Sequence, residues 1–138
     1  MSPVKPDTED RPSGPQLPLT HQKALDLGLR HHSAGDLSTA KDIYQKILQA
    51  DSKHTDALHL LGVISYQVGE NERAVDLISK VLATKPDFAQ AHCNLGIALK
   101  KLGRLDEAVA SYNKAIGIKP DYAEAHYNLG SISQKTNF

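Results

Sequence analysis

Apolar residues recur along this chain with a fixed period of 34 residues. One phase of the period holds a leucine followed by a glycine, and a second glycine follows seven residues later. These positions are Leu27-Gly28, Leu61-Gly62, Leu95-Gly96 and Leu129-Gly130, then Gly35, Gly69 and Gly103. A period of this size is typical of stacked repeats, in which each unit is too small to bury its apolar face alone.

Within each period the apolar spacing predicts two helices joined by a short turn. In the stretch 38–49, Ala40, Ile43, Tyr44 and Ile47 follow the i, i+3, i+4 pattern of one helix face. The predicted helices span 21–34 and 38–49, 57–68 and 72–83, and 89–102 and 105–118, and a further first helix begins at residue 123.

The two glycine phases need different explanations. Gly96 lies inside a predicted helix, where glycine costs about 1 kcal/mol relative to alanine. We infer that its missing side chain lets the second helix approach closely, with Ala108 of that helix at the contact. Gly103 lies at a helix end, where a left-handed residue is commonly needed. Asp87 and Asp121 follow prolines and are expected to cap the next helices.

The period divides the chain into a tail and four units. Residues 1–20 contain five prolines and little apolar surface, so we expect a disordered tail. The units are 21–54, 55–88, 89–122 and 123–138. The last contains only a first helix, which is interpreted either as a polar capping element or as the start of further repeats in a longer array.

The repeat resembles the tetratricopeptide repeat (TPR) family. The matching positions in unit 89–122 are Leu95, Gly96, Gly103, Ala108, Tyr112, Ala115 and Pro120. The leading tryptophan of the family is replaced at each occurrence, by Ala24, Leu58, His92 and His126. The resemblance implies an all-α fold, an α-solenoid of helix-turn-helix TPR units coiled into a right-handed superhelix. It also implies that the first helix of each unit lines a concave groove.

Mapping the inward positions of the first helices predicts a peptide-binding groove. Apolar members form a strip edged by polar groups, as expected of a surface that holds a peptide or helix. The candidate groove residues are Leu25, Asp26, Leu29, His59, Leu60, Val63, Gln90, Asn94, Ile97, Lys101, Tyr127 and Asn128. The alternative is that several of them only pack one repeat on the next.

Asn94 and Asn128 share one phase, and their surroundings resemble the TPR arms of O-linked N-acetylglucosamine transferase-like proteins. There, asparagines at this phase form a ladder. An amide can both donate and accept, so it can bind a peptide backbone of any sequence. Asp26 and Leu60 interrupt the ladder, and the alternative is that each asparagine bonds its own neighbours.

Another TPR subgroup clamps the terminal carboxylate of chaperone tails with cationic side chains and asparagines. The matching positions here hold Leu25, Leu29, Leu60, Gln90 and Asn94. Because the cations are missing, we expect no clamp of that kind.

Composition excludes several classes of function. The 16 basic and 16 acidic residues balance, so no attraction to nucleic acid or anionic lipid is expected. The single cysteine, Cys93, excludes an intrachain disulfide, lacks a base at helical spacing and is interpreted as a groove thiol. His31 and His32 diverge by about 100° on a helix, so they are poorly placed to share a metal ion.

We therefore expect no catalytic, cofactor-binding or metal site, no membrane insertion and a cytoplasmic location. The first hypothesis is a protein-interaction module, a scaffold or adaptor that binds a protein or peptide partner. The second is the N-terminal targeting arm, or a fragment, of a larger enzyme such as a glycosyltransferase. The third is a scaffold that self-associates through its C-terminal helix, with Ile132 and Phe138 in the contact.

Overall fold

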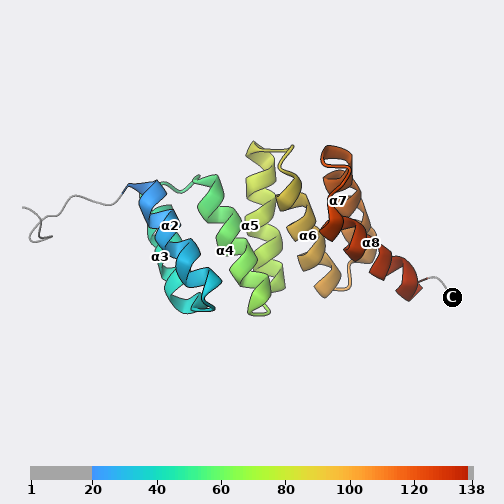
Figure 1. Ribbon diagram of the computed structural model, residues 1–138, viewed down its shortest axis with the longest axis horizontal. Helices are drawn as coiled ribbons and strands as arrows, with labels where there is room; N and C mark the ends of the chain where they lie inside the picture. Colours follow the sequence, from blue (N-terminus) through green and yellow to red (C-terminus); the bar gives the residue numbers. More distant parts are fainter. Residues whose placement is uncertain (1–19, 137–138) are drawn as a thin grey trace, which may run out of the picture.

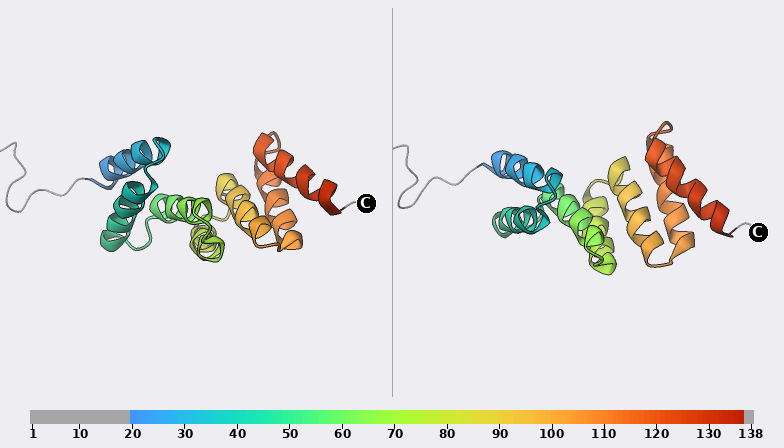
Figure 2. Two further views of the ribbon diagram at one scale, coloured as in Figure 1. Left: turned by 90° about the horizontal axis from the view of Figure 1, so that it is seen from below. Right: turned by 60° about the horizontal axis from the view of Figure 1, so that its bottom comes forward.

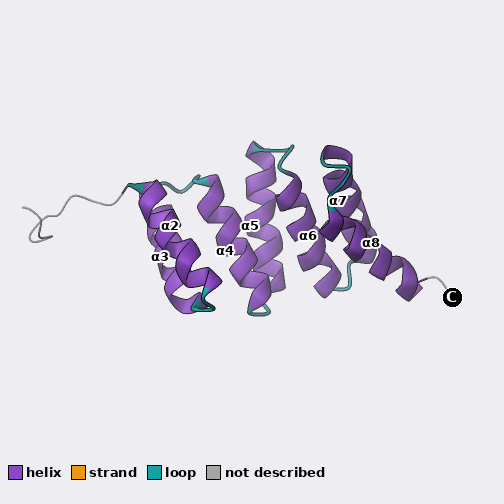
Figure 3. Cartoon of the chain, viewed as in Figure 1, coloured by secondary structure: helices purple, strands orange, loops and turns teal. Residues whose placement is uncertain are grey.

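The protein is represented by a computed structural model that describes residues 20–136, and these residues form a row of helices (Figure 1). The helices are α2 (His21–Ser33), α3 (Leu37–Ala50), α4 (Thr55–Gln67), α5 (Asn71–Thr84), α6 (Ala89–Lys101), α7 (Leu105–Ile118) and α8 (Ala123–Thr136). Within the described residues there is no strand (Figure 3). The predicted all-α solenoid is thus confirmed, while the predicted tail and Phe138 lie outside the described residues, apart from Thr20.

The helices pack as three antiparallel pairs, α2 with α3, α4 with α5, and α6 with α7, and α8 packs on α7. Each pair contacts the next through α3 and α4, then α5 and α6. Both views of Figure 2 keep the helices in chain order along the long axis. The buried apolar residues accordingly form two clusters and not one central core. The partly buried Leu95 packs against both clusters. This serial packing is the arrangement that stacked repeats produce.

The second glycine phase ends the first helix of each pair as predicted. Gly35, Gly69 and Gly103 have positive φ values of 84°, 90° and 78°. At the end of α4 the N–H of Gly69 donates to the Tyr66 carbonyl at 3.2 Å, and the N–H of Glu70 donates to the Ser65 carbonyl at 2.7 Å. These two bonds form a Schellman motif, which satisfies the last carbonyls of the helix and reverses the chain.

The first glycine phase permits close helix approach, and the side chain nearest to Gly28, Gly62 and Gly96 is larger than the alanine that the sequence predicted. A Cβ atom at Gly96 would lie 2.6 Å from Cε1 of Tyr112, and one at Gly28 would lie 2.5 Å from Cε1 of Tyr44. At Gly62 the same atom would meet Ile78 at 2.7 Å. The atoms nearest to the missing Cβ therefore belong to the large residue of the second helix, four positions after the predicted alanine. The missing side chain therefore makes room for a buried ring.

The predicted cap at Asp87 is also wrong. Phe88 occupies the N-cap position of α6, and no side chain caps that helix end. The turn is held from the helix instead, because Nε2 of His92 donates to the Pro86 carbonyl at 2.7 Å. His126 repeats the bond to the Pro120 carbonyl at 2.8 Å. Two of the residues that replace the family's tryptophan thus fix the linkers before α6 and α8.

Candidate functional site

The first helices α2, α4, α6 and α8 form one continuous side of the array, which we call the inner wall. α4 contacts α6, and α6 contacts α8, whereas the second helices α3, α5 and α7 make no comparable contact with one another. From α4 to α8 the first helices are thus in closer contact with one another than the second helices are. The predicted groove residues all lie on these four helices.

The middle of the inner wall is built around Asn94. Its Nδ2 donates to Nε2 of His59 at 2.8 Å, and its Oδ1 accepts from the Tyr66 hydroxyl at 3.2 Å. Since Nε2 of His59 accepts, the imidazole proton lies on Nδ1 and the ring is neutral. The ring also packs edge-on against Phe88, with 4.8 Å between centroids. These contacts join α4 to α6 through three buried or partly buried polar side chains.

Burial also controls the protonation of this cluster. Burial lowers the pKa of His59 to about 4; the nearby Asp56 acts in the opposite direction, and Lys85 adds a smaller lowering effect. The Tyr66 hydroxyl has its pKa raised to about 12, chiefly by burial. Both groups are therefore neutral across the physiological range, which suits a hydrogen-bonded support better than acid–base chemistry.

Polar bonds also join the first helices at both ends of the wall. Between α2 and α4, Nε2 of His32 donates to Oε1 of Gln67 at 2.8 Å. Between α6 and α8, Nζ of Lys100 donates to Oδ1 of Asn128 and to the Ser131 hydroxyl, each at 3.3 Å.

The prediction of the site missed His32, Tyr66 and Lys100. They share one phase, three residues before each turn glycine, and polar character at that phase is visible in the sequence. Their partners lie 28 to 35 residues further along the chain. Assigning residues to helix faces within one repeat therefore does not detect these hydrogen-bonded pairs.

Several predicted groove residues are closed to a partner. Leu25, His59 and Asn94 are only 5%, 3% and 5% exposed, and Asn128 is also buried. Both ends of the Asn94 amide bond to its own chain, which is the alternative to a peptide ladder that the sequence left open. We therefore correct the assignment of these residues from partner contacts to supports of the wall.

Cys93 is corrected in the same way. Its thiol is fully buried, and burial, with Glu124 nearby, raises its pKa to about 11. Leu25, His59 and Cys93 share one phase, and all three are buried. Tyr127 has the same phase but is 76% exposed, because no further first helix of the described chain packs over it.

The remaining predicted residues form an open row along the inner wall. Leu29 is 39% exposed, while Leu60, Val63 and Ile97 are half-buried between it and Tyr127. The polar residues of the predicted groove that are exposed are Asp26, Gln90 and Lys101. Asp26 accepts a hydrogen bond from the side-chain amide of Gln22. Together, these apolar and polar residues are the predicted groove residues whose side chains remain at least partly accessible in the described structure.

Metal and membrane chemistry find no support in the described part of the chain. Nowhere in residues 20–136 do three His, Cys, Asp or Glu side chains gather closely enough to hold a metal ion. Over the same residues no helix has the length and apolar character needed to cross a bilayer.

Comparison with known proteins identifies the repeat. A family model described as "Tetratricopeptide repeat" matches residues 31–101, more than half of the chain, and one described as "TPR repeat" matches residues 98–137. The chain belongs to the tetratricopeptide repeat family. The resemblance inferred from the Leu-Gly phases is thus confirmed. Among curated proteins, the comparison finds no match to this TPR chain.

Solved TPR structures share the fold. A crystal structure of MamA is 25% identical, has a TM-score of 0.77, and covers 84% of this chain and 68% of its own. MamA from Desulfovibrio magneticus RS-1 is 21% identical with a TM-score of 0.78, covering 85% of this chain and 66% of its own. The chain thus spans about two thirds of these MamA chains. The first TPR of Spaghetti (RPAP3), bound to the HSP90 peptide SRMEEVD, is 22% identical with a TM-score of 0.79, covering 83% of this chain and 91% of its own.

Proposed function

We propose that this TPR chain is a protein-interaction module that holds an extended or helical segment of a partner protein against its inner wall. The observation that carries the proposal is the open row on that wall. Large apolar side chains that stay exposed in a line are typical of binding surfaces. Leu29 and Tyr127 mark the two ends of the row, and the half-buried Leu60, Val63 and Ile97 form its floor.

The wall behind this row supports binding because it is already ordered. The bonds that Asn94 makes to His59 and Tyr66 fix α6 against α4 before any partner arrives. A partner therefore does not have to order the wall, which reduces the entropic cost of association. Asn94 acts in this proposal by positioning the neighbouring Ile97, and not by touching the partner.

Charge along the wall favours one direction for the bound segment. Asp26 is exposed at the α2 end and Lys101 at the C-terminal end of α6. A partner segment with basic residues toward α2 and acidic residues toward the end of α6 would complement both. The RPAP3 structure supports peptide binding by this fold, but the chaperone-tail clamp is not carried over, because Leu25, Leu29 and Leu60 stand at three of its positions.

A matched pair of double variants tests the proposal. Leu29→Ser with Tyr127→Ser removes the two most exposed apolar residues of the row, whereas Val68→Ser with Ile118→Ser removes apolar residues that are 52% and 41% exposed elsewhere. Each variant and the wild type serve as bait in cells of the source organism, with captured proteins quantified by mass spectrometry. We expect the first variant to lose specific proteins by about tenfold or more, as for contacts at binding hot spots, and the second to retain them. Equal recovery by both variants would show that the row is not the binding surface.

Self-association is a second candidate function, supported by one feature of α8. A Cβ atom at Gly130 would meet nothing within 4 Å, whereas the equivalent glycines each face a side chain of a second helix. A hollow of about 240 Å³ lies there, lined by Gly130, His126, Tyr127 and Ser131. A second copy could pack a helix against this face. Sedimentation velocity that shows only monomer across a wide concentration range would exclude it.

A further inference from the structure

The link between α6 and α8 differs from the other links of the inner wall because its donor is a lysine. Lys100 is half-buried, and its Nζ donates to Oδ1 of Asn128 and to the Ser131 hydroxyl, each at 3.3 Å. An ammonium group can only donate, so the amide oxygen of Asn128 must face it. The Ser131 hydroxyl donates in turn to the Asn128 carbonyl at 2.8 Å, which leaves its oxygen able to accept from Lys100.

No carboxylate balances this positive charge within the described residues. The ion pairs of residues 20–136 lie at the turn between α2 and α3 and at the start of α7, and Lys100 takes part in neither. Glu124 precedes Asn128 by one turn of α8, but it forms no ion pair with Lys100. The ammonium group is thus partly withdrawn from water and held only by neutral oxygens. A cation in this environment gains from contact with an anion.

The preceding repeat contains a closed version of the same link. One period before Lys100 and Asn128 stand Tyr66 and Asn94, whose side chains are joined at 3.2 Å. There the donor is a neutral hydroxyl, and Nδ2 of Asn94 is also bonded, to His59. The Nδ2 of Asn128 has no hydrogen-bond partner among the described residues. The α6–α8 link is therefore charged and incomplete, whereas the α4–α6 link is neutral and closed.

The charged link lies beside the open row of the inner wall. Residues three or four apart on a helix are neighbours on its surface. Ile97 precedes Lys100 by three residues on α6, and Tyr127 precedes Ser131 by four on α8. The open row crosses from α6 to α8 between Ile97 and Tyr127. A partner segment that covers both apolar residues therefore passes Lys100, and a residue within the segment can reach the ammonium group with its side chain.

We propose that Lys100 binds an acidic side chain of the partner segment, an aspartate or a glutamate, and that Asn128 and Ser131 position its ammonium group. This contact rests on the proposed function, because it concerns one residue of the segment held along the open row. Apolar contacts are non-directional, so the row alone allows a segment to slide. An ion pair at a partly desolvated site fixes the register. The partner then requires an acidic residue at the place that faces α6 and α8.

Small probes test the site in the full-length chain by NMR. Acetyl-glutamate amide offers a side-chain carboxylate, and acetyl-glutamine amide is its neutral counterpart. We expect the acidic probe to shift the side-chain signals of Lys100 and Asn128 at a concentration about tenfold or more below that of the neutral probe, because hydrogen bonds between charged groups are stronger. An equal response to both probes, or no response, would overturn the proposal. A response only to N-acetylalanine, which has a terminal carboxylate alone, would overturn it as well.

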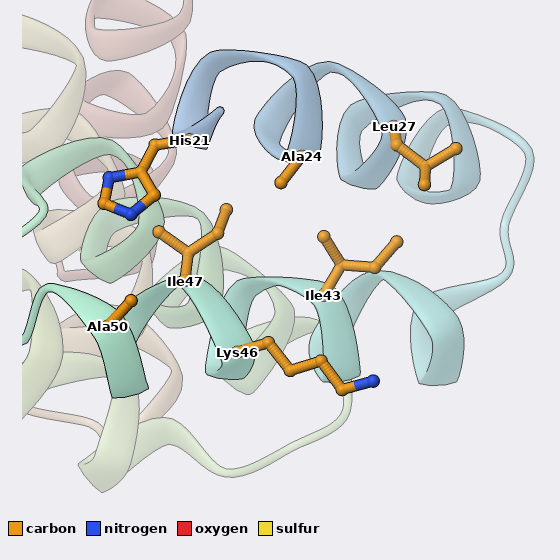
Figure 4. Close-up of a pocket in the computed structure, with 7 residues that line it drawn as sticks. All are labelled: His21, Ala24, Leu27, Ile43, Lys46, Ile47 and Ala50. Carbon is orange, nitrogen blue, oxygen red and sulfur yellow. The ribbon is translucent and has the colours of Figure 1, made fainter. Parts of the chain in front are cut away.

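Three variants that lower the net charge by the same amount separate this site from general charge attraction. Lys100→Gln removes the cation, and Asn128→Asp provides a carboxylate of the chain itself that occupies the cation. Each should weaken binding of the acidic probe by about tenfold or more. Lys46→Gln is the control: Lys46 lines an apolar cavity of about 440 Å³ between α2 and α3 (Figure 4), and its ammonium group makes no hydrogen bond or ion pair with a described residue. An equal loss in Lys46→Gln, or no loss in Lys100→Gln, would contradict the assignment.

The same variants used as bait separate the acidic contact from the proposed function. We expect Lys100→Gln to lose the proteins that Leu29→Ser with Tyr127→Ser loses, and Lys46→Gln to retain them. If the double variant loses them while Lys100→Gln retains them, the row binds a partner and the acidic contact is wrong. If the double variant retains them, the proposed function fails and the acidic contact falls with it.

Discussion

The close helix approach at Gly96 predicts that a side chain there lowers the stability of the protein. Gly130, at the same repeat position, provides a control for which the opposite change in stability is expected. Gly96→Ala puts a Cβ atom 2.6 to 2.8 Å from three ring atoms of Tyr112. The ring is fully buried, so it cannot turn into solvent to relieve the overlap. Gly130 lies one period later, in α8, and a Cβ atom there meets nothing within 4 Å.

Two opposing effects set the magnitude. Replacing glycine by alanine within a helix stabilises it by about 1 kcal/mol, whereas overpacking a filled core costs about 1–3 kcal/mol. If overpacking costs only about 1 kcal/mol, the two effects cancel for Gly96→Ala. With an overpacking cost in the middle of its range, we expect a net destabilisation of about 1 kcal/mol. Gly96→Val adds two further methyl groups against the ring and should cost about 2 kcal/mol or more. Gly130→Ala has no overlap and should stabilise α8 by up to about 1 kcal/mol.

Urea unfolding followed by circular dichroism, with residue-resolved hydrogen exchange for α8, measures these differences. Local exchange is needed because stacked repeats do not have to unfold in one step. The reasoning fails if Gly96→Val unfolds at the same urea concentration as wild type. It also fails if Gly96→Ala stabilises the chain as much as Gly130→Ala does, since contact with the ring would then be irrelevant.

Three further predictions concern single side chains. The folded pKa of His59 is lowered to about 4, below its ordinary value. The contribution of this residue to the free energy of unfolding is therefore fully present above about pH 6.5, and about 3 kcal/mol is lost as the pH drops toward 4. Unfolding of the wild type measured at several pH values should show this loss, and His59→Gln should reduce it. The hydroxyl of Tyr112 is buried without a hydrogen-bond partner among the described residues, so Tyr112→Phe should leave the melting temperature unchanged or raise it, whereas Tyr44→Phe loses a bond to a histidine and should lower it slightly. Gly69 has a φ of 90°, so Gly69→Ala should destabilise by about 1–2 kcal/mol in thermal unfolding, and an unchanged midpoint would contradict the left-handed requirement.

Much of the fold could be predicted from the sequence because each helix pair repeats the same contacts at a fixed spacing. The Leu-Gly phase and the turn glycines such as Gly103 were enough to locate the helix pairs, since both depend on neighbours within one repeat. The sequence named Ala108 as the contact of Gly96, whereas the atoms nearest to the missing Cβ belong to Tyr112. Only the distances in the structure show that the ring of Tyr112 fills the space.

The candidate site was less predictable because exposure on the inner wall depends on the next repeat. Periodicity places Leu25, Cys93 and Tyr127 at one phase, yet the first two are buried and the last is exposed. The role of Asn94 depended on partners in a neighbouring repeat, His59 and Tyr66. A pattern within one repeat carries no information on such pairs.

Two of the polar links between first helices differ in how strongly they resist separation of the helices. Tyr66 and Asn94 meet in a buried cluster with His59, so opening the array there would strand polar groups away from water. His32 and Gln67 meet at an exposed site, where water can replace either partner at little cost. A ligand that pushes the first helices apart would therefore separate α2 from α4 before it separates α4 from α6.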